Sequence, residues 1–517
     1  MTPVSDGPVS DADADVVIGV DIGTTSTKSV AFTVGGRAVA EHSVGYPLDE
    51  PSPGFAEQDP ALILDAVRRT VAHVAAACDG RVRGLSFSSA MHSLIGLDAD
   101  GAPLTPSVTW ADARAGAQAE RLRAGPIGLA LHQRTGTPVH PMSPLTKLIW
   151  FHDEQPELCR RVAHWVGIKE YVFSQLVGGP GAPVLVMDHS VASGTGLMNI
   201  HTVDWDDEAL GLAGVTAEQL PELVPTTHIL PSLSAESCAS LGVPADTPVV
   251  VGAGDGPLAN LGSGAIRPGV ASCSIGTSGA MRVIVEQARV DPRGGVFCYA
   301  LTESRWAVGG AINNGGLVLD WAGEALAPDL GDAPYDALLD AAASAPAGCG
   351  GLVMLPYLQG ERAPHWSSLP RGVYVGLTRE HRREHLVRAA LEGVCLQLAT
   401  VMDSVRTAGN EVREIRATGG FARSPLWRQM LADVLGLDVG FPAGHEGSSF
   451  GAALLGMQAL GMIESIDVAA ELVRIEQTVH PDPAASAVYA ELWPVFVGLY
   501  DALVPTFTAL GRLAPHR

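Results

Sequence analysis

Two segments of this chain share one pattern: an apolar strand, a turn of glycine and hydroxyl residues, and a second strand. The first runs from Val16 to Phe32 and contains DIGTTSTK; the second runs from Val270 to Val285 and contains IGTSG. Each predicts a β-hairpin with backbone amides and hydroxyls at its tip. Because 517 residues exceed one ordinary core, the repeat predicts two similar domains, each opening with this hairpin.

Strands and helices alternate after both hairpins, which is typical of α/β organisation. A helix is predicted from Asp59-Pro60 to Cys78, followed by a strand at 84–87. In the second half, an apolar stripe from Val387 to Val405 predicts a long helix, followed by a strand at 414–418. We therefore expect a tail at 1–14, a first domain at 15–259, a second domain at 260–505 and a C-terminal tail at 506–517.

The charge balance bears on the partners of the chain. With 56 acidic and 33 basic residues, the net charge is -23, and such a surface repels nucleic acid and anionic lipid. No apolar stretch is read as a membrane span, so we expect neither nucleic acid nor membrane as a partner. Seven dispersed cysteines without a CxxC pair indicate reduced thiols and a cytoplasmic location.

The two turns have the composition of phosphate-binding loops, since amides, hydroxyls and a nearby lysine are the donors that phosphates need. In the first hairpin, Asp21 at the strand end is a candidate Mg²⁺ ligand. Two such tips facing each other could hold a triphosphate from both sides. The candidate phosphate-binding residues are Gly23, Thr24, Thr25, Ser26 and Lys28 in the first hairpin and Gly276, Thr277 and Ser278 in the second.

Asp255 lies between glycines at the end of the apolar strand 248–251, directly before the second hairpin. Transfer of a phosphoryl group to a hydroxyl needs a base that orients the hydroxyl and accepts its proton. We take Asp255 as this catalytic base and as a second candidate Mg²⁺ ligand. The alternative is an Asx-turn aspartate with no role in chemistry.

Together these motifs resemble the FGGY family of carbohydrate kinases, which belongs to the actin–hexokinase–Hsp70 superfamily. The resemblance extends from about Val16 to about Leu499. It implies two actin-like (ribonuclease H-like) domains around a central nucleotide and sugar cleft, with ATP and Mg²⁺ as cofactors. It places the sugar in the first domain, most of the nucleotide in the second, and the catalytic base at Asp255. By the same resemblance, further nucleotide contacts are Asn313, Gly419, Gly420, Phe421 and Ser424.

The strings SSAMHSLI (88–95) and TWAD-x-R (109–114) look most like the gluconate kinases of that family. The resemblance thus implies transfer of the γ-phosphate to D-gluconate, giving 6-phospho-D-gluconate. Ala113 departs from the pattern, since asparagine is expected there. The implied substrate-binding residues are Ser89, Met91, His92, Trp110, Asp112, Arg114 and Asp255.

Gluconate carries a carboxylate, which needs a cation or a cluster of donors. The candidates for this role remain open: Arg114, Lys147, His92, His140 and His189. Met91-His92 also occurs in xylulose kinases, so xylulose or another neutral polyol is an alternative substrate. A non-catalytic actin-like or Hsp70-like ATPase module is an alternative of another class. By analogy with relatives, the chain is expected to form a homodimer.

Overall fold

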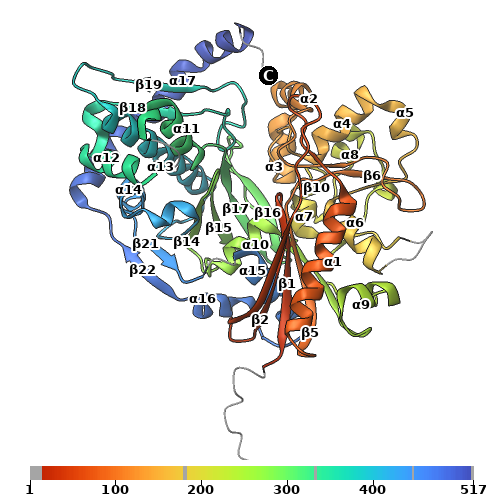
Figure 1. Cartoon of the computed structure of the whole chain (residues 1–517). Coiled ribbons are helices and arrows are strands. Elements are labelled where there is room, and N and C mark those ends of the chain that lie inside the picture. Colours follow the sequence, from red (N-terminus) through yellow and green to blue (C-terminus); the bar gives the residue numbers. More distant parts are fainter. Residues whose placement is uncertain (1–13, 178–182, 331–334, 445–446, 514–517) are drawn as a thin grey trace, which may run out of the picture.

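The computed structural model describes residues 14–177, 183–330, 335–444 and 447–513, so the expected tail at 1–14 lies almost wholly outside the described residues. Two α/β halves lie side by side, with the N-terminal half at the right of Figure 1 and most of the C-terminal half at the left. The sheet of the N-terminal half has the order β3-β2-β1-β5-β13. Its strands are β1 (Val16–Ile22), β2 (Ser26–Thr33), β3 (Ala38–Gly45), β5 (Val82–Ser89) and β13 (Val249–Gly254).

The sheet of the C-terminal half has the order β16-β17-β15-β14-β20-β21-β22. In both sheets the opening strand pairs antiparallel with the next strand and parallel with a later one. The two similar α/β domains expected from the repeated hairpin are therefore confirmed, and the fold agrees with the actin-like domains that the resemblance implies. The strands of this sheet are β14 (Val270–Ile275), β15 (Gly279–Val285), β16 (Phe297–Thr302), β17 (Arg305–Ile312), β20 (Glu414–Thr418), β21 (Val439–Pro442) and β22 (Ile475–Val479).

Helices cover the sheets where the apolar stripes predict them. The Asp59 side chain caps α1 (Pro60–Ala77) by accepting a bond from the Ala61 amide. The predicted long helix is α13 (Arg383–Thr407). Other helices of the N-terminal half are α2 (Gly116–Ala124), α3 (Gly128–Thr135), α4 (Pro144–Glu154), α6 (Ile168–Val177), α7 (His189–Ser193), α8 (Asp207–Ala213) and α9 (Ala235–Leu241). The C-terminal half adds α11 (Leu317–Leu326), α12 (Tyr335–Ser344) and α14 (Pro425–Leu435).

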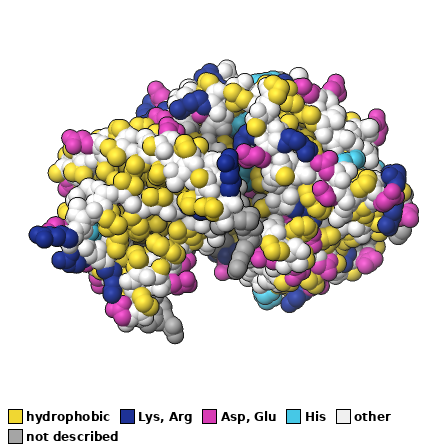
Figure 2. Space-filling view, turned by 90° about the horizontal axis from the view of Figure 1, so that it is seen from above, with side chains coloured by type: hydrophobic (Ala, Val, Ile, Leu, Met, Phe, Trp, Pro, Cys, Tyr) yellow, Lys and Arg dark blue, Asp and Glu magenta, His cyan; other side chains and the backbone are white. Residues whose placement is uncertain are grey.

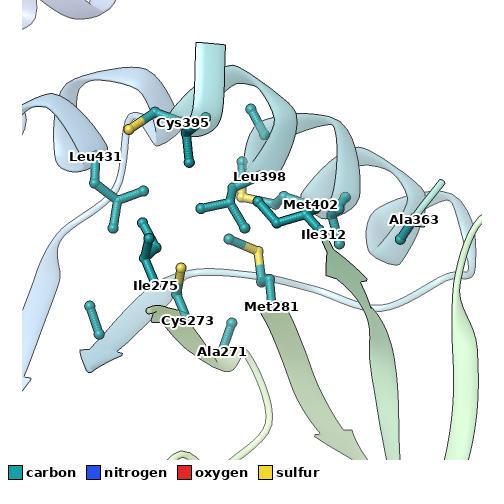
Figure 3. Close-up of a cluster of buried hydrophobic side chains, with 14 of the residues drawn as sticks. Ala271, Cys273, Ile275, Met281, Ile312, Ala363, Cys395, Leu398, Met402 and Leu431 are labelled. Carbon is teal, nitrogen blue, oxygen red and sulfur yellow. The ribbon is translucent and has the colours of Figure 1, made fainter. Parts of the chain in front are cut away.

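The core of the C-terminal half forms where α13 packs on its sheet (Figure 3). Leu398 and Met402 of the helix face Ile275, Met281 and Ile312 of the strands, and these side chains are buried. Burial of such side chains stabilises a fold by about 1.5–3 kcal/mol each. The packing holds β14 and β15 firmly, and with them the second turn.

Two helices connect the halves: α10 (Asp255–Gly262), which spans the expected boundary at Asn260, and α15 (Gly447–Ala459). Although α15 comes late in the chain, it packs on α10 and on β1 and β5 of the first sheet. The backbones approach closely, because a Cβ on Gly262 would collide with the Gly447 carbonyl. The two sheets therefore meet through small residues beneath the cleft.

The expected C-terminal tail at 506–517 is wrong for its described part, because α17 (Pro483–Leu513) continues as helix to Leu513. The physical reason is Phe507, which is buried in a cluster with Leu355, Tyr357 and Phe496. By length and composition alone, α13 and α17 could each cross a membrane, although no apolar stretch of the sequence was expected to be a membrane span. The α13 window is 89% buried in the protein, whereas the α17 window is 11% buried.

Candidate active site

A cavity of about 230 Å³, here called the sugar cavity, lies between the two halves. Its walls come from the first hairpin, from the loops after β5 and from β15, β16 and β17 of the second sheet. The cavity therefore exists only where both halves meet. Its side chains capable of polar contacts include Thr24, His92, Trp110, Asp255, Ser278, Arg282, Tyr299 and Arg362.

Asp255 enters the sugar cavity from the first turn of α10, at the carboxyl end of β13. Its Oδ1 accepts a bond from the Gly256 amide at 2.7 Å. The strand end before it is held by Lys169, which donates to the Ala253 carbonyl at 3.2 Å, and by Ser190, whose hydroxyl accepts from the Gly254 amide at 3.2 Å. Burial raises the pKa of Asp255, with nearby Arg282 acting in the opposite direction. A carboxylate fixed in this way and more basic than usual suits a proton acceptor.

The segment Asp188–Ser193 supports this strand end from behind. Asp188 forms a fully buried ion pair with Lys169 at 2.6 Å. Its other oxygen caps α7 by accepting bonds from the Ser190 and Val191 amides, both at 3.0 Å. Since α7 carries Ser190, the pair links Lys169 and α7 into one support for Asp255.

His92 lies in the wall of the sugar cavity with a φ of 68°, a strained conformation for a residue other than glycine. Its Nδ1 lies 2.7 Å from the Gly194 carbonyl, an acceptor, so Nδ1 carries the hydrogen. Burial lowers the pKa of His92 to about 3. The ring is thus neutral and presents Nε2 as an acceptor, which suits a sugar hydroxyl and not a carboxylate.

Trp110 connects the first hairpin to the sugar cavity, because its Nε1 donates to the Thr24 hydroxyl at 2.8 Å. The Arg362 guanidinium lies over the Trp110 ring, 5.0 Å from the ring centroid. Arg362 donates to the Asn313 side-chain oxygen at 2.7 Å and to the Ile312 carbonyl at 3.1 Å. Asn313, expected to contact the nucleotide, therefore positions an arginine of the sugar cavity.

Arg282 and Tyr299, together with Arg362, were missed by the sequence reasoning. Arg282 lies on β15 and Tyr299 on β16, and both line the sugar cavity. The Tyr299 hydroxyl is buried and has no hydrogen-bond partner among the described residues. A signal was available for Arg282, since it is the one charged residue within the apolar stretch 280–285.

Asp112 and Arg114, expected to bind substrate, do not line the sugar cavity. Arg114 donates to both Asp112 oxygens at 2.8–3.0 Å and to Glu57 at 2.5 Å, and it lies 3.9 Å from the Phe55 ring centroid. Asp112 also accepts from the Ala56 amide at 2.7 Å. Asp112 and Arg114 therefore bind each other and their neighbours, and they stabilise the loop after Val108. Ala113 is exposed, so the missing asparagine removes no contact with the cavity.

The other expected ligands also have different surroundings. Lys147 is fully buried and donates to the carbonyls of His92 at 2.6 Å, Thr109 at 2.7 Å and Val108 at 3.3 Å. Burial lowers the pKa of His140 and of His189, so neither favours the charged form. Ser89 is buried at the end of β5, outside the cavity lining, whereas Met91 lines the cavity.

A larger cavity of about 960 Å³, the nucleotide cavity, lies in the C-terminal half. The second turn joins the two spaces, because Gly276 and Thr277 line the nucleotide cavity while Ser278 lines the sugar cavity. Gly420, Phe421 and Ser424 also line the nucleotide cavity. Ser424 caps α14 by accepting from the Trp427 amide at 3.2 Å, so a helix N-terminus faces this space and favours anions there.

A third cavity of about 820 Å³ is lined by Asp21, Lys28, Gly419 and Gly420. Gly419 has a φ of 110° and approaches the Ile275 carbonyl too closely to carry a Cβ. Asp21 accepts from the Ser88 hydroxyl at 2.6 Å, and Lys28 pairs with Glu41 at 3.0 Å. In the turn of the first hairpin, Thr24 lines the sugar cavity, while Gly23, Thr25 and Ser26 line none of these three cavities.

The two candidate Mg²⁺ ligands line different cavities, Asp21 the third cavity and Asp255 the sugar cavity. In the described part of the chain, no group of three or more His, Cys, Asp or Glu could hold a metal ion. Mg²⁺ binds kinases through one or two carboxylates, substrate phosphates and water. Asp21, a carboxylate at a strand end that lines a cavity, is the kind of group that could hold such an ion together with phosphates and water.

Comparison with known proteins identifies the relatives. Family models for the N-terminal and C-terminal domains of the FGGY carbohydrate kinases match residues 16–262 and 271–460. Gluconokinase of Bacillus subtilis (strain 168) is 42% identical over 96% of this chain and 97% of its own, and xylulose kinase of the same strain is 30% identical over 96% and 98%. The crystal structure of gluconate kinase from Lactobacillus acidophilus superposes with a TM-score of 0.92 at 36% identity, covering 96% of this chain and 99% of that one. The chain therefore belongs to the FGGY family of carbohydrate kinases.

Proposed function

We propose that this enzyme transfers the γ-phosphate of ATP to the 6-hydroxyl of D-gluconate. The observation that carries the proposal is the placement of Asp255, the one acidic residue among those lining the sugar cavity, in the same cavity as Ser278. Ser278 belongs to the turn that also lines the nucleotide cavity. Membership of a carbohydrate-kinase family removes the non-catalytic ATPase module as an alternative.

Each chemical step has a residue to perform it. Asp255 accepts the proton of the 6-hydroxyl while the hydroxyl oxygen attacks the γ-phosphorus, and ADP leaves on the opposite side. Amides and hydroxyls of Gly276, Thr277 and Ser278 hold the phosphate chain during transfer. Bound Mg²⁺, held by Asp21 and the phosphates, would neutralise negative charge on the transferring group.

Gluconate is favoured over xylulose by the higher identity to the gluconokinase, 42% against 30%. The cavity also combines neutral acceptors with cations. His92 suits hydroxyl groups, while Arg282 and Arg362 supply positive charge that a neutral ketose does not require. This combination suits a polyol that ends in an acid.

The test is an ADP-release assay of the purified enzyme with ATP, Mg²⁺ and one sugar at a time. Gluconate, xylulose, ribulose and glycerol form the panel. We expect gluconate to have the highest kcat/KM, with phosphate on the terminal hydroxyl of the product by ³¹P–¹H NMR. A higher kcat/KM for xylulose or glycerol would reject gluconate as the substrate while keeping the kinase assignment.

We further propose a cytoplasmic homodimer that forms through α17. This helix carries large exposed apolar side chains, and Figure 2 shows many hydrophobic side chains on the left part of the face seen from above. The exposed apolar residues of α17 are Val488, Val495, Val504, Leu510 and Leu513. Light scattering of the purified protein should give twice the chain mass of 53.7 kDa, falling to one chain mass in Val495→Asp/Val504→Asp. A monomeric wild-type protein would contradict this assembly.

A further inference from the structure

We propose that Arg282, together with Arg362, binds the carboxylate of the substrate and so selects sugar acids over neutral polyols. The inference rests on the proposed function and deepens it, because it assigns the group that distinguishes gluconate from the neutral substrates of relatives. It also assigns the carboxylate contact to Arg282 in place of the earlier candidates, because the surroundings of those residues leave none of them as an available cation in the sugar cavity. Those candidates are Arg114, Lys147, His92, His140 and His189.

The charge balance of the cavity is the first argument. Two guanidinium groups and one carboxylate line it, in a chain whose net charge is -23. Arg282 and Arg362 are close enough for their charges to repel, while Glu361 beside Arg362 and Asp255 beside Arg282 act in the opposite direction. Among the described residues, Arg282 itself forms no ion pair. A buried charge without an ion-pair partner is costly unless an opposite charge joins it. A substrate carboxylate supplies that charge, and a guanidinium can bind it with two parallel hydrogen bonds.

The strand register is the second argument. Ala280 and Ala311 are paired across β15 and β17, and both line the sugar cavity next to the second turn. Because side chains on a strand alternate, Arg282 lies on the same face as Ala280, and its Cα lies about 7 Å from that of Ala280, away from the second turn. An extended six-carbon acid spans a similar distance, so its 6-hydroxyl can reach the phosphate end while its carboxylate reaches Arg282.

The Tyr299 hydroxyl provides an independent sign of a ligand. It is buried in the same wall, it lacks a partner among the described residues, and charge interactions link it to both Arg282 and Arg362. A buried hydroxyl without a partner is destabilising, and a bound polar ligand would recover that loss. Donation to a carboxylate or to the neighbouring hydroxyl of the acid would satisfy it.

A different role for Arg282 is contact with the transferring phosphate, because its Nε would lie 3.2 Å from a Cβ built on Gly256, the neighbour of Asp255. The two roles predict different losses. A carboxylate contact affects gluconate and spares D-glucitol, which has the same carbon chain ending in a hydroxymethyl group. A phosphate contact weakens ATP binding and slows transfer to any sugar.

The experiment measures Kd for gluconate, D-glucitol and ATP by calorimetry in wild-type enzyme and in Arg282→Met. We expect the gluconate Kd to rise roughly 10- to 100-fold, as for loss of charge-assisted hydrogen bonds, so that the preference for acid over polyol collapses. An equal rise for gluconate and D-glucitol, or a rise confined to ATP, would overturn the inference. Arg282→Lys keeps the charge and loses the two parallel donors of the guanidinium, so its preference for gluconate over D-glucitol should fall less than that of Arg282→Met. An unchanged preference in both variants would also overturn the inference.

Arg293→Met is the matched control, since Arg293 lies in the same half with its side chain 67% exposed and outside the sugar cavity. It should leave all three Kd values unchanged. The two hypotheses fail separately. Wild-type enzyme that does not phosphorylate gluconate contradicts the proposed function, whereas wild-type turnover of gluconate with an unchanged acid preference in Arg282→Met contradicts this inference alone.

Discussion

The two hairpins have the same scaffold and place their cations differently. In the first, Lys28 is paired in register with Asp21, lines the third cavity and meets Glu41 with its side chain 31% exposed. In the second, the corresponding place beside the turn is taken by Ala280, and the cation Arg282 follows two residues later. A shift of two residues along a strand keeps the face of the sheet and moves the charge by about 7 Å.

The different placement of the two cations assigns the two hairpins to different ligands. Lys28 can reach anions that enter the third cavity, whereas Arg282 faces the enclosed sugar cavity beside Asp255. Small residues at Ala280 and Ala311 leave room there for a carbon chain. On this account the first hairpin contributes to nucleotide binding and the second to both phosphate transfer and substrate choice.

Asp255→Asn should have the largest effect, because both hairpins serve a reaction that needs this base. We expect kcat with gluconate to fall about 10²- to 10⁴-fold, while gluconate and ATP Kd values stay within a few-fold. Steady-state kinetics and calorimetry measure the two quantities. Near-normal turnover in this variant would remove Asp255 from the mechanism.

Lys28→Met tests the first hairpin as the counterpart of Arg282→Met. We expect the KM for ATP to rise about tenfold through loss of a charge-assisted contact, with the gluconate Kd unchanged. Glu41→Gln is the control, since it removes the Lys28 partner and keeps the lysine. If Lys28→Met weakened gluconate more than ATP, the division of roles between the hairpins would be wrong.

Asn313→Ala distinguishes two roles for a residue first expected to touch the nucleotide. Since Asn313 accepts from Arg362, its loss should loosen that arginine and raise the gluconate KM about threefold to tenfold, with little change in the KM for ATP. D-Glucitol binding should change less than gluconate binding. An effect confined to ATP would restore the nucleotide contact.

The pH dependence of kcat/KM should show the smallest of these effects. Because burial raises the pKa of Asp255, the acid limb of kcat/KM should lie above the usual range of a carboxyl group, with activity lost as the pH falls through it. Arg282 lowers this pKa, so Arg282→Met should move the limb to higher pH, whereas Lys28→Met should leave it in place. A limb shifted equally in both variants would contradict the separation of the two cations.

Local sequence patterns predicted the architecture well, because they are physical constraints on neighbouring residues. The two hairpins, the Asp59 cap and the stripe of α13 all appear where they were expected. The end of α17 was missed, since burial of Phe507 depends on distant Leu355 and Tyr357.

The sugar site was harder to predict, because a charged residue shows its type in the sequence and not its partner. From the sequence, Arg114 and Lys147 were both candidates to bind the substrate carboxylate. In the structure Arg114 binds Asp112 and Glu57, and Lys147 donates to three backbone carbonyls. Arg282 and Arg362 reach the cavity from strands and loops of the other half. Only the folded contact between halves brings them beside Asp255.

The most direct test is a crystal structure of the enzyme with gluconate and a non-hydrolysable ATP analogue. We predict that the carboxylate of gluconate binds the guanidinium groups of Arg282 and Arg362, and that the 6-hydroxyl lies within hydrogen-bond distance of Asp255, facing the γ-phosphate at Ser278. A carboxylate bound elsewhere, or a 6-hydroxyl turned away from Asp255, would contradict it.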